Sequence, residues 1–253
     1  MNFSKINFSD KDINNFDTRG FLVVRKAFPI GVVKCIQGWA DELANFPETP
    51  GRHWVYHETS IFDQKTKLLS RIENIQEFHH GFKKVNETLA TAVGKLFRER
   101  AILFKEKLNF KLPGGDGFKP HQDCQAGWQS YAHDFITVVI SIDQATEKNG
   151  CLKIAPNISA KKMFREWEPL SDEDLNGVGL KECPTEPGDL IFFDAYTPHS
   201  SDPNMSNKTR RMYFATYNRA SVGDHRKQYF ADKHRNYPPD IEREDGKEYV
   251  FKV

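Results

Sequence analysis

The chain has 253 residues, of which 38% are hydrophobic and 13% aromatic, enough for a sizeable core in one large domain or two small ones. Its 36 Lys and Arg residues nearly balance 35 Asp and Glu residues, so no overall positive charge attracts nucleic acid or an anionic membrane surface. The four cysteines are scattered and form no CxxC pair, which predicts free thiols. The sequence shows no signal-peptide pattern and no apolar run of about 20 residues, so we expect a cytoplasmic protein without a membrane span.

The N-terminal part of the chain mixes helices with one strand. A short helix is expected between Ser9, a good N-cap, and Gly20, a good C-terminal stop. A strand over 21–28 and a helix over 31–46 follow. Residues 47–75 combine Pro, Gly, His and aromatic residues without a period, and we interpret them as a loop that could close over a site.

The next segment carries one apolar stripe at spacings of three and four residues, which predicts a long amphipathic helix. The stripe consists of Phe78, Phe82, Val85, Leu89, Val93 and Leu96.

From residue 101 the pattern becomes that of short strands separated by turns. Strands are expected at 101–112, 133–143, 151–156, 188–196 and 210–218, with turns at 113–117 and 146–150. This succession predicts a mainly β fold, a sandwich or barrel with helices packed outside it. No internal repeat or linker marks a second domain.

The stretch "FKPHQDCQAGWQSY" (118–131) contains the first candidate site residues. His121 and Asp123 are two positions apart, so in a strand both would point to one face. An HxD pair alone is a weak signal, but His199 follows a later apolar strand. Two histidines and one carboxylate leave three open positions on a metal, the usual arrangement in non-haem Fe(II) oxygenases.

Two consecutive arginines, Arg210 and Arg211, begin the last predicted strand. A guanidinium binds a carboxylate through two parallel hydrogen bonds, so one of them could hold the distal carboxylate of a dicarboxylic co-substrate. Strand alternation allows only one to face inward. A zinc-dependent hydrolase could use the same three ligands but would not need this arginine, and a non-catalytic binding protein would need no metal.

Several motifs resemble the phytanoyl-CoA dioxygenase family of Fe(II)/2-oxoglutarate oxygenases. They are "NFDTRGFLVVRKAF", "HQD", "TEKNGCLKIAPNIS", "EPGDLIFFD" with the following "AYTPH", and Arg210. The resemblance implies a double-stranded β-helix (jelly roll, cupin-like) with flanking helices. It also implies one domain over 1–253, with a helix-rich part of about 1–100, a jelly-roll core of about 101–220 and an extension of about 221–253.

The same resemblance implies roles for individual residues. His121, Asp123 and His199 would bind Fe(II), and Arg210 would hold the C5 carboxylate of 2-oxoglutarate, with O₂ as the second co-substrate. Asn109 and Thr137 would contact 2-oxoglutarate. Relatives often carry tryptophan where this chain has Val139, and no acyl-CoA-binding positions are recognisable, which argues against phytanoyl-CoA as the substrate.

The C-terminal stretch "TYNRASVGDHRKQYFADKHRNYPP" resembles the branch that hydroxylates 2-aminoethylphosphonate and its N-methylated forms at the carbon bearing phosphorus. This implies a zwitterionic aminoalkylphosphonate substrate; another small zwitterion, such as an amino acid or a betaine-like compound, is the main rival. Candidates for binding the phosphonate are Lys107, His133, Arg165 and Arg219. Candidates for an aromatic wall around the ammonium are Trp128, Tyr131 and Tyr196.

Overall fold

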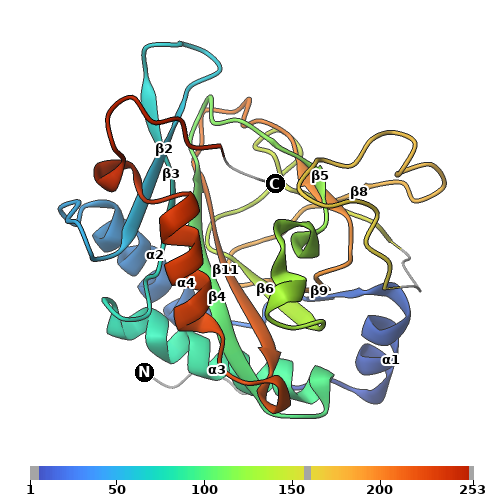
Figure 1. Cartoon of the computed structure of the whole chain (residues 1–253). Helices are drawn as coiled ribbons and strands as arrows, with labels where there is room; N and C mark the ends of the chain where they lie inside the picture. Colours follow the sequence, from blue (N-terminus) through green and yellow to red (C-terminus); the bar gives the residue numbers. More distant parts are fainter. Residues whose placement is uncertain (1–5, 157–160, 251–253) are drawn as a thin grey trace.

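The structure is a computed structural model that describes residues 6–156 and 161–250, and it contains two antiparallel β-sheets flanked by helices (Figure 1). The larger sheet has the strand order β1 (Phe21–Val24), β9 (Leu190–Asp194), β6 (Phe135–Ser141), β11 (Arg210–Arg219), β4 (Ala101–Lys111), β3 (Lys67–Glu73) and β2 (Trp54–Thr59). The smaller sheet has the order β5 (Phe118–His121), β10 (His199–Ser201), β7 (Leu152–Ile154) and β8 (Lys181–Cys183).

The two sheets face each other across an apolar layer. One buried cluster combines Val139, Ile191 and Phe214 of the larger sheet with Leu152 and Ile154 of the smaller sheet. Two antiparallel sheets that share an inner core have the architecture of a double-stranded β-helix, so the predicted jelly roll is confirmed.

Helices cover the outer face of the larger sheet. The helices α1 (Asp10–Arg19), α2 (Ile30–Ala44) and α3 (His80–Phe97) lie in the chain regions predicted for them. The predicted stripe is buried against this sheet except for Phe78, which lies before α3 and is half-buried. Its members Phe82, Val85 and Leu89 belong to one cluster with Leu108 of β4 and Tyr213 of β11. Packing of this apolar stripe supplies most of the stability of such a helix.

The N-cap of α1 also agrees with the sequence pattern. The Ser9 hydroxyl accepts the backbone N–H of Asp12, and the Asp12 carboxylate accepts the backbone N–H of Ser9, which completes a capping box. Gly20 ends the helix with φ 75°, in the left-handed region where glycine is favoured.

The prediction of a loop over 47–75 is wrong. Residues 54–73 form the hairpin of β2 and β3, and β3 pairs with β4 in the larger sheet. Trp54, Val55 and Tyr56 are consecutive and all buried, so the hairpin lacks the polar–apolar alternation of a half-exposed strand. The strand predicted at 21–28 also ends earlier, at Val24.

A further helix, α4 (Arg226–Asn236), was not predicted and packs against β4. Short 3₁₀ turns complete the described part of the fold: η1 (Asp123–Ala126), η2 (Trp128–Ser130), η3 (Ala220–Val222) and η4 (Asp240–Glu242). The four cysteines are free, as expected. Among the described residues, no helix combines the length and apolar character needed to cross a membrane.

Candidate active site

The two candidate histidines meet in the antiparallel pairing of β5 with β10. His121, the last residue of β5, lies opposite His199, the first of β10, with ring centroids 4.3 Å apart. The expectation that His121 and Asp123 share a strand face is wrong, because the strand ends at His121 and Asp123 begins η1. The turn nevertheless brings the carboxylate to the histidines, and one ligand atom of each residue lies within 4.8 Å of the others.

Both imidazoles offer the Nε2 atom to a metal. Nδ1 of His121 lies 2.7 Å from the carbonyl oxygen of Lys119, and Nδ1 of His199 lies 3.0 Å from that of Thr197. A carbonyl oxygen can only accept, so each Nδ1 carries the hydrogen and each Nε2 keeps its lone pair.

The carboxylate of Asp123 is fixed by a threonine. The Thr137 hydroxyl donates to Oδ2 of Asp123 at 2.9 Å and lies 2.9 Å from the hydroxyl of Thr216. The other oxygen, Oδ1, lies 4.0 Å from Nε2 of His199. Thr137 was expected to contact 2-oxoglutarate, but here its hydroxyl contacts a metal ligand.

The protonation of the triad suits a divalent metal. Burial, together with nearby His199, lowers the pKa of His121 to about 3, and burial also lowers the pKa of His199. Burial opposes ionisation of Asp123, but His199 and the ammonium groups of Lys105 and Lys107 hold the pKa of its carboxyl below the usual value. Two neutral imidazoles and one carboxylate form a donor set that fits Fe(II) and leaves positions open for reactants.

A narrow recess beside the triad contains two polar groups without partners among the described residues. Its wall includes His121, His199, Asn109 and Arg210. Arg210 is only 3% exposed, and its Nε atom and the Oδ1 atom of Asn109 have no hydrogen-bond partner in the described part of the chain. Burial lowers the pKa of Arg210 to about 10, which leaves the guanidinium charged at neutral pH. A buried, charged guanidinium with an unpaired N–H group indicates a binding site for a carboxylate.

Arg211 points away from this recess. Its Nε atom donates to Oδ2 of Asp143 at 2.8 Å, and it also pairs with Asp41 of α2. Of the two consecutive arginines, Arg210 therefore faces the metal ligands.

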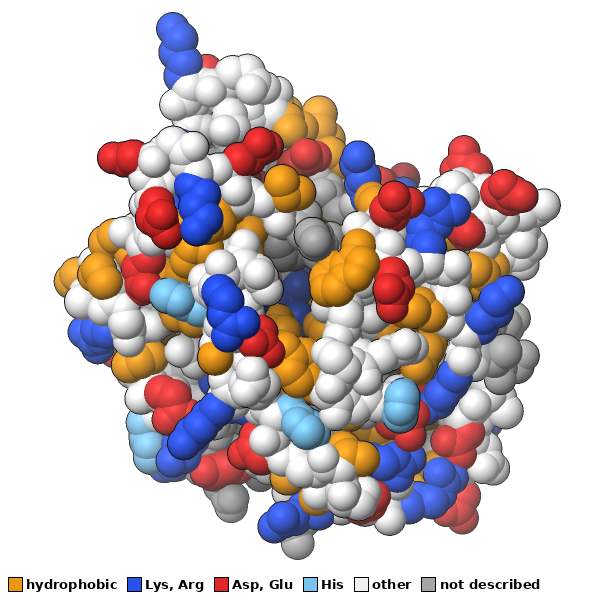
Figure 2. Space-filling model, viewed as in Figure 1, with side chains coloured by type: hydrophobic (Ala, Val, Ile, Leu, Met, Phe, Trp, Pro, Cys, Tyr) orange, Lys and Arg blue, Asp and Glu red, His pale blue; other side chains and the backbone are white. Residues whose placement is uncertain are grey.

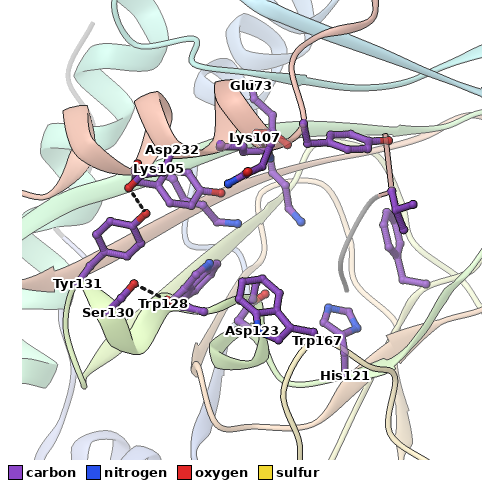
Figure 3. A pocket seen from close by; sticks show the side chains of 18 residues that line it. Glu73, Lys105, Lys107, His121, Asp123, Trp128, Ser130, Tyr131, Trp167 and Asp232 are labelled. Carbon is purple, nitrogen blue, oxygen red and sulfur yellow. Dashed lines mark hydrogen bonds and ion pairs between the residues drawn. The ribbon is translucent and has the colours of Figure 1, made fainter. Parts of the chain in front are cut away.

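A larger cavity of about 450 Å³ adjoins His121 and Asp123 and opens on the face shown in Figure 2. Its aromatic walls include Trp128, Tyr131, Trp167 and Tyr229. Its charged walls are Glu73, Lys105, Lys107, Asp123, Asp232 and Lys233. Figure 3 shows Lys105, Lys107 and Glu73 on one side of the cavity, across from Trp128, Asp123 and His121. This cavity has room for a small molecule with charges of both signs.

Of the residues predicted to contact substrate, three line this cavity and four do not. Lys107, Trp128 and Tyr131 lie in its wall. His133 is exposed on the surface, and Arg165 forms an ion pair with Asp174. The remaining two are Tyr196 and Arg219.

The positions of Tyr196 and Arg219 explain why they miss the cavity. The Tyr196 hydroxyl accepts a hydrogen bond from the side chain of Gln129. Arg219 is the last residue of β11, and its guanidinium donates to the carbonyl oxygen of Phe97 and to Asp134. We therefore assign no substrate contact to His133, Arg165, Tyr196 or Arg219.

Sequence reasoning missed several cavity residues. Lys105 was not predicted as a cavity residue. The signal that could have identified it is the alternation of Lys105, Lys107, Asn109 and Lys111 along β4, which places four polar groups on one strand face. Three more, Tyr229, Asp232 and Lys233, come from α4. Their spacing of three and four residues is the helical signal that could have identified them.

Comparison with known proteins gives a consistent result along most of the chain. The family model described as "Phytanoyl-CoA dioxygenase (PhyH)" matches residues 16–212. A 2-aminoethylphosphonate dioxygenase of the uncultured bacterium HF130_AEPn_1 is 38% identical over 96% of this chain and 94% of its own. A methylphosphonate hydroxylase of Gimesia maris is 30% identical over 90% of this chain and 88% of its own.

Solved structures share the fold at low sequence identity. EctD from S. alaskensis, crystallised with 2-oxoglutarate and 5-hydroxyectoine, superposes with a TM-score of 0.72 at 20% identity, covering 85% of this chain and 77% of its own. The epimerase SnoN, crystallised with Fe³⁺, alpha-ketoglutarate and nogalamycin RO, superposes with a TM-score of 0.71 at 16% identity, covering 96% of both chains.

Proposed function

The chain belongs to the phytanoyl-CoA dioxygenase family of Fe(II)/2-oxoglutarate-dependent dioxygenases, and we propose that its substrate is a small aminoalkylphosphonate, hydroxylated at the carbon next to phosphorus. Membership of this family excludes the zinc-dependent hydrolase and the non-catalytic binding protein as alternatives. The observation that carries the substrate proposal is the similarity, over nearly the whole chain, to a 2-aminoethylphosphonate dioxygenase. A second relative, also aligned over most of its length, is named for another phosphonate.

The cavity beside the triad supports this substrate class. It offers ammonium groups that can bind an anion and an aromatic wall that can bind an ammonium ion. Its volume of about 450 Å³ is ample for a molecule as small as 2-aminoethylphosphonate.

The proposed mechanism gives roles to the triad and to two residues of the recess beside it. His121, Asp123 and His199 would hold Fe(II), which with 2-oxoglutarate and O₂ would supply the oxidation that yields succinate, CO₂ and a hydroxylated substrate carbon. Arg210 binds the C5 carboxylate of 2-oxoglutarate, with Asn109 beside it. The recess beside Arg210 would thereby hold the co-substrate and leave the larger cavity for the substrate.

Turnover of a defined panel tests the substrate proposal. The protein is incubated with Fe(II), O₂ and 2-oxoglutarate, and succinate is measured with and without 2-aminoethylphosphonate, its N-methylated forms, methylphosphonate, amino acids and betaines. We expect stimulation by an aminoalkylphosphonate and a product that is one oxygen atom heavier. If only an amino acid or a betaine stimulates succinate formation, the substrate is that other zwitterion and the phosphonate proposal is wrong.

Substitutions in the triad test the metal assignment. His121→Ala or Asp123→Ala should abolish 2-oxoglutarate decarboxylation and bound iron together, because either change removes one of three ligands. His133→Ala is the control, since His133 is exposed and outside the cavity. Full iron content and turnover in both triad variants would refute the assignment.

Two broader expectations stay predictions. The first is a single oxygenase domain over 1–253, which limited proteolysis would test. The second is a cytoplasmic location, which fractionation of cells would test.

A further inference from the structure

Strand β4 presents two lysines side by side to the larger cavity. Lys105 and Lys107 are separated by one residue and lie opposite Thr216 and Phe214 of β11. Both side chains line the cavity, and Figure 3 shows them on the same side of it. Lys107 also lines the recess that holds Arg210, so it lies where the two spaces meet beside the metal ligands.

Neither ammonium group has an anionic partner within hydrogen-bond or ion-pair distance among the described residues. Nζ of Lys105 lies 4.2 Å from the ring centroid of Trp128, and Nζ of Lys107 lies 5.1 Å from that of Phe214. The third lysine of the cavity differs, because Nζ of Lys233 lies 2.5 Å from Oε2 of Glu73.

Two ammonium groups that line one cavity and have no acidic partner among the described residues are unfavourable unless an anion joins them. Burial lowers the pKa of both lysines, and the neighbouring Lys107 lowers that of Lys105 further. Attraction to Asp123 acts in the opposite direction on both pKa values. An anionic ligand would relieve the cost of holding both charges.

We propose that Lys105 and Lys107 are the phosphonate-binding residues of this enzyme, an inference that rests on the proposed function and extends it to the orientation of the substrate. A phosphonate offers three oxygens and up to two negative charges, which matches two ammonium donors better than a carboxylate does. Held by Lys107 beside the triad, the phosphonate brings its attached carbon to the metal, the position at which hydroxylation is proposed.

The amine of the substrate then extends toward the aromatic side of the cavity. Tyr131 and Trp167 line it there, and the Tyr131 hydroxyl donates to Oδ2 of Asp232 at 2.7 Å. Aromatic faces and a carboxylate are the groups that bind an ammonium ion. The lysines thus recognise the phosphonate end, and Asp232 recognises the amine end.

The test measures binding as well as turnover. The protein is loaded with Fe(II) and 2-oxoglutarate without O₂, and the dissociation constants of 2-aminoethylphosphonate and methylphosphonate are determined by calorimetry. Lys105→Met and Lys107→Met should each weaken both ligands about 10- to 100-fold, the range expected for losing a charge-assisted hydrogen bond. Asp232→Asn should weaken 2-aminoethylphosphonate and leave methylphosphonate unchanged.

Two controls separate this effect from misfolding and from net charge. Lys107→Arg keeps the charge and should retain most of the affinity that Lys107→Met loses. Lys83→Met makes the same charge change on the exposed face of α3 and should bind like the wild type. Iron content and the melting temperature of each variant show whether the fold and the metal site are intact.

The outcomes distinguish the two proposals. If both lysine variants bind the two phosphonates as tightly as the wild type, and the wild type hydroxylates an aminoalkylphosphonate, the lysine assignment is wrong and the proposed function stands. If methylphosphonate binding depends on the lysines but the enzyme hydroxylates no aminoalkylphosphonate, the lysines form an anion-binding subsite and the proposed function is wrong. A wild-type protein that binds neither ligand overturns both.

Discussion

Arg210 lies directly opposite Lys111 in the pairing of β11 with β4, so two buried basic side chains are neighbours on the inner face of the larger sheet. Lys111 is held by the hydroxyl of Ser201 at 2.7 Å and by the carbonyl oxygen of Asp202. Burial, with Arg210 nearby, lowers the pKa of Lys111 to about 6, so this lysine is mostly neutral at pH 7. Of this pair, the guanidinium of Arg210 then carries the positive charge.

The first prediction concerns the affinity for 2-oxoglutarate. Arg210→Met should raise its dissociation constant on the order of 100-fold, because the buried guanidinium is the group proposed to bind the C5 carboxylate through two hydrogen bonds. Calorimetric titration of 2-oxoglutarate into Fe(II)-loaded protein measures this directly.

The neighbouring residue offers a matched control for this titration. Arg211→Met removes the same charge one position along, but Arg211 pairs with Asp143 and Asp41 away from the recess. It should leave the affinity for 2-oxoglutarate within about twofold, at some cost in stability. Equal losses in both variants would contradict the assignment of Arg210.

The second prediction concerns metal affinity. Thr137→Val keeps the shape of the side chain but removes the hydroxyl that donates to Asp123. Loss of such a supporting hydrogen bond typically weakens metal binding about 10- to 100-fold. Competition with a chelator gives the iron dissociation constant, and iron affinity equal to that of the wild type would show that Thr137 does not orient the ligand.

Candidate metal ligands can be identified from the sequence because their chemistry is local and specific. Packing alone gives no reason for an HxD pair, a later histidine and an arginine to occur in this order among β-strands. The strand argument for His121 and Asp123 was nevertheless wrong, since the pair spans the end of β5 and the start of η1. Ligand types are visible in the sequence, but the turn that orients them is not.

The substrate cavity was harder to predict because it depends on contacts between distant segments. Arg219 and Lys107 are both basic residues on neighbouring strands, yet only Lys107 reaches the cavity. A β-bulge between Thr216 and Tyr217 shifts the register of β11 before Arg219. The hairpin of β2 and β3 was missed for a related reason, since its buried faces do not alternate.

The third prediction concerns a glycine between the two sheets. Gly150 has φ +71°, and a Cβ atom there would lie 2.1 Å from the backbone oxygen of Asp202, just after β10. Gly150→Ala should therefore lower the free energy of unfolding by about 3 kcal/mol or more, through backbone strain and overlap. Urea denaturation at pH 7 measures the loss.

Gly177 provides the comparison for Gly150. Its φ of +77° is nearly the same, but a Cβ atom there meets nothing within 4 Å. Gly177→Ala should cost only the backbone strain, about 1 kcal/mol. Similar losses in the two variants would show that the contact with Asp202 does not matter.

The last prediction concerns how stability changes with pH. Lys111 has a pKa of about 6 in the folded protein, against about 10.4 in an unfolded chain. Between these values the unfolded chain binds more protons, so the free energy of unfolding should rise with pH, by at most about 1.4 kcal/mol per unit from this residue.

In metal-free protein at pH 7.0 and 8.5, the wild type should gain stability relative to Lys111→Met. Lys153→Met is the control, because hydrogen bonding to Asp202 raises the pKa of Lys153 and keeps it protonated in both states. An identical pH dependence for wild type and Lys111→Met would mean that Lys111 keeps its charge inside the fold.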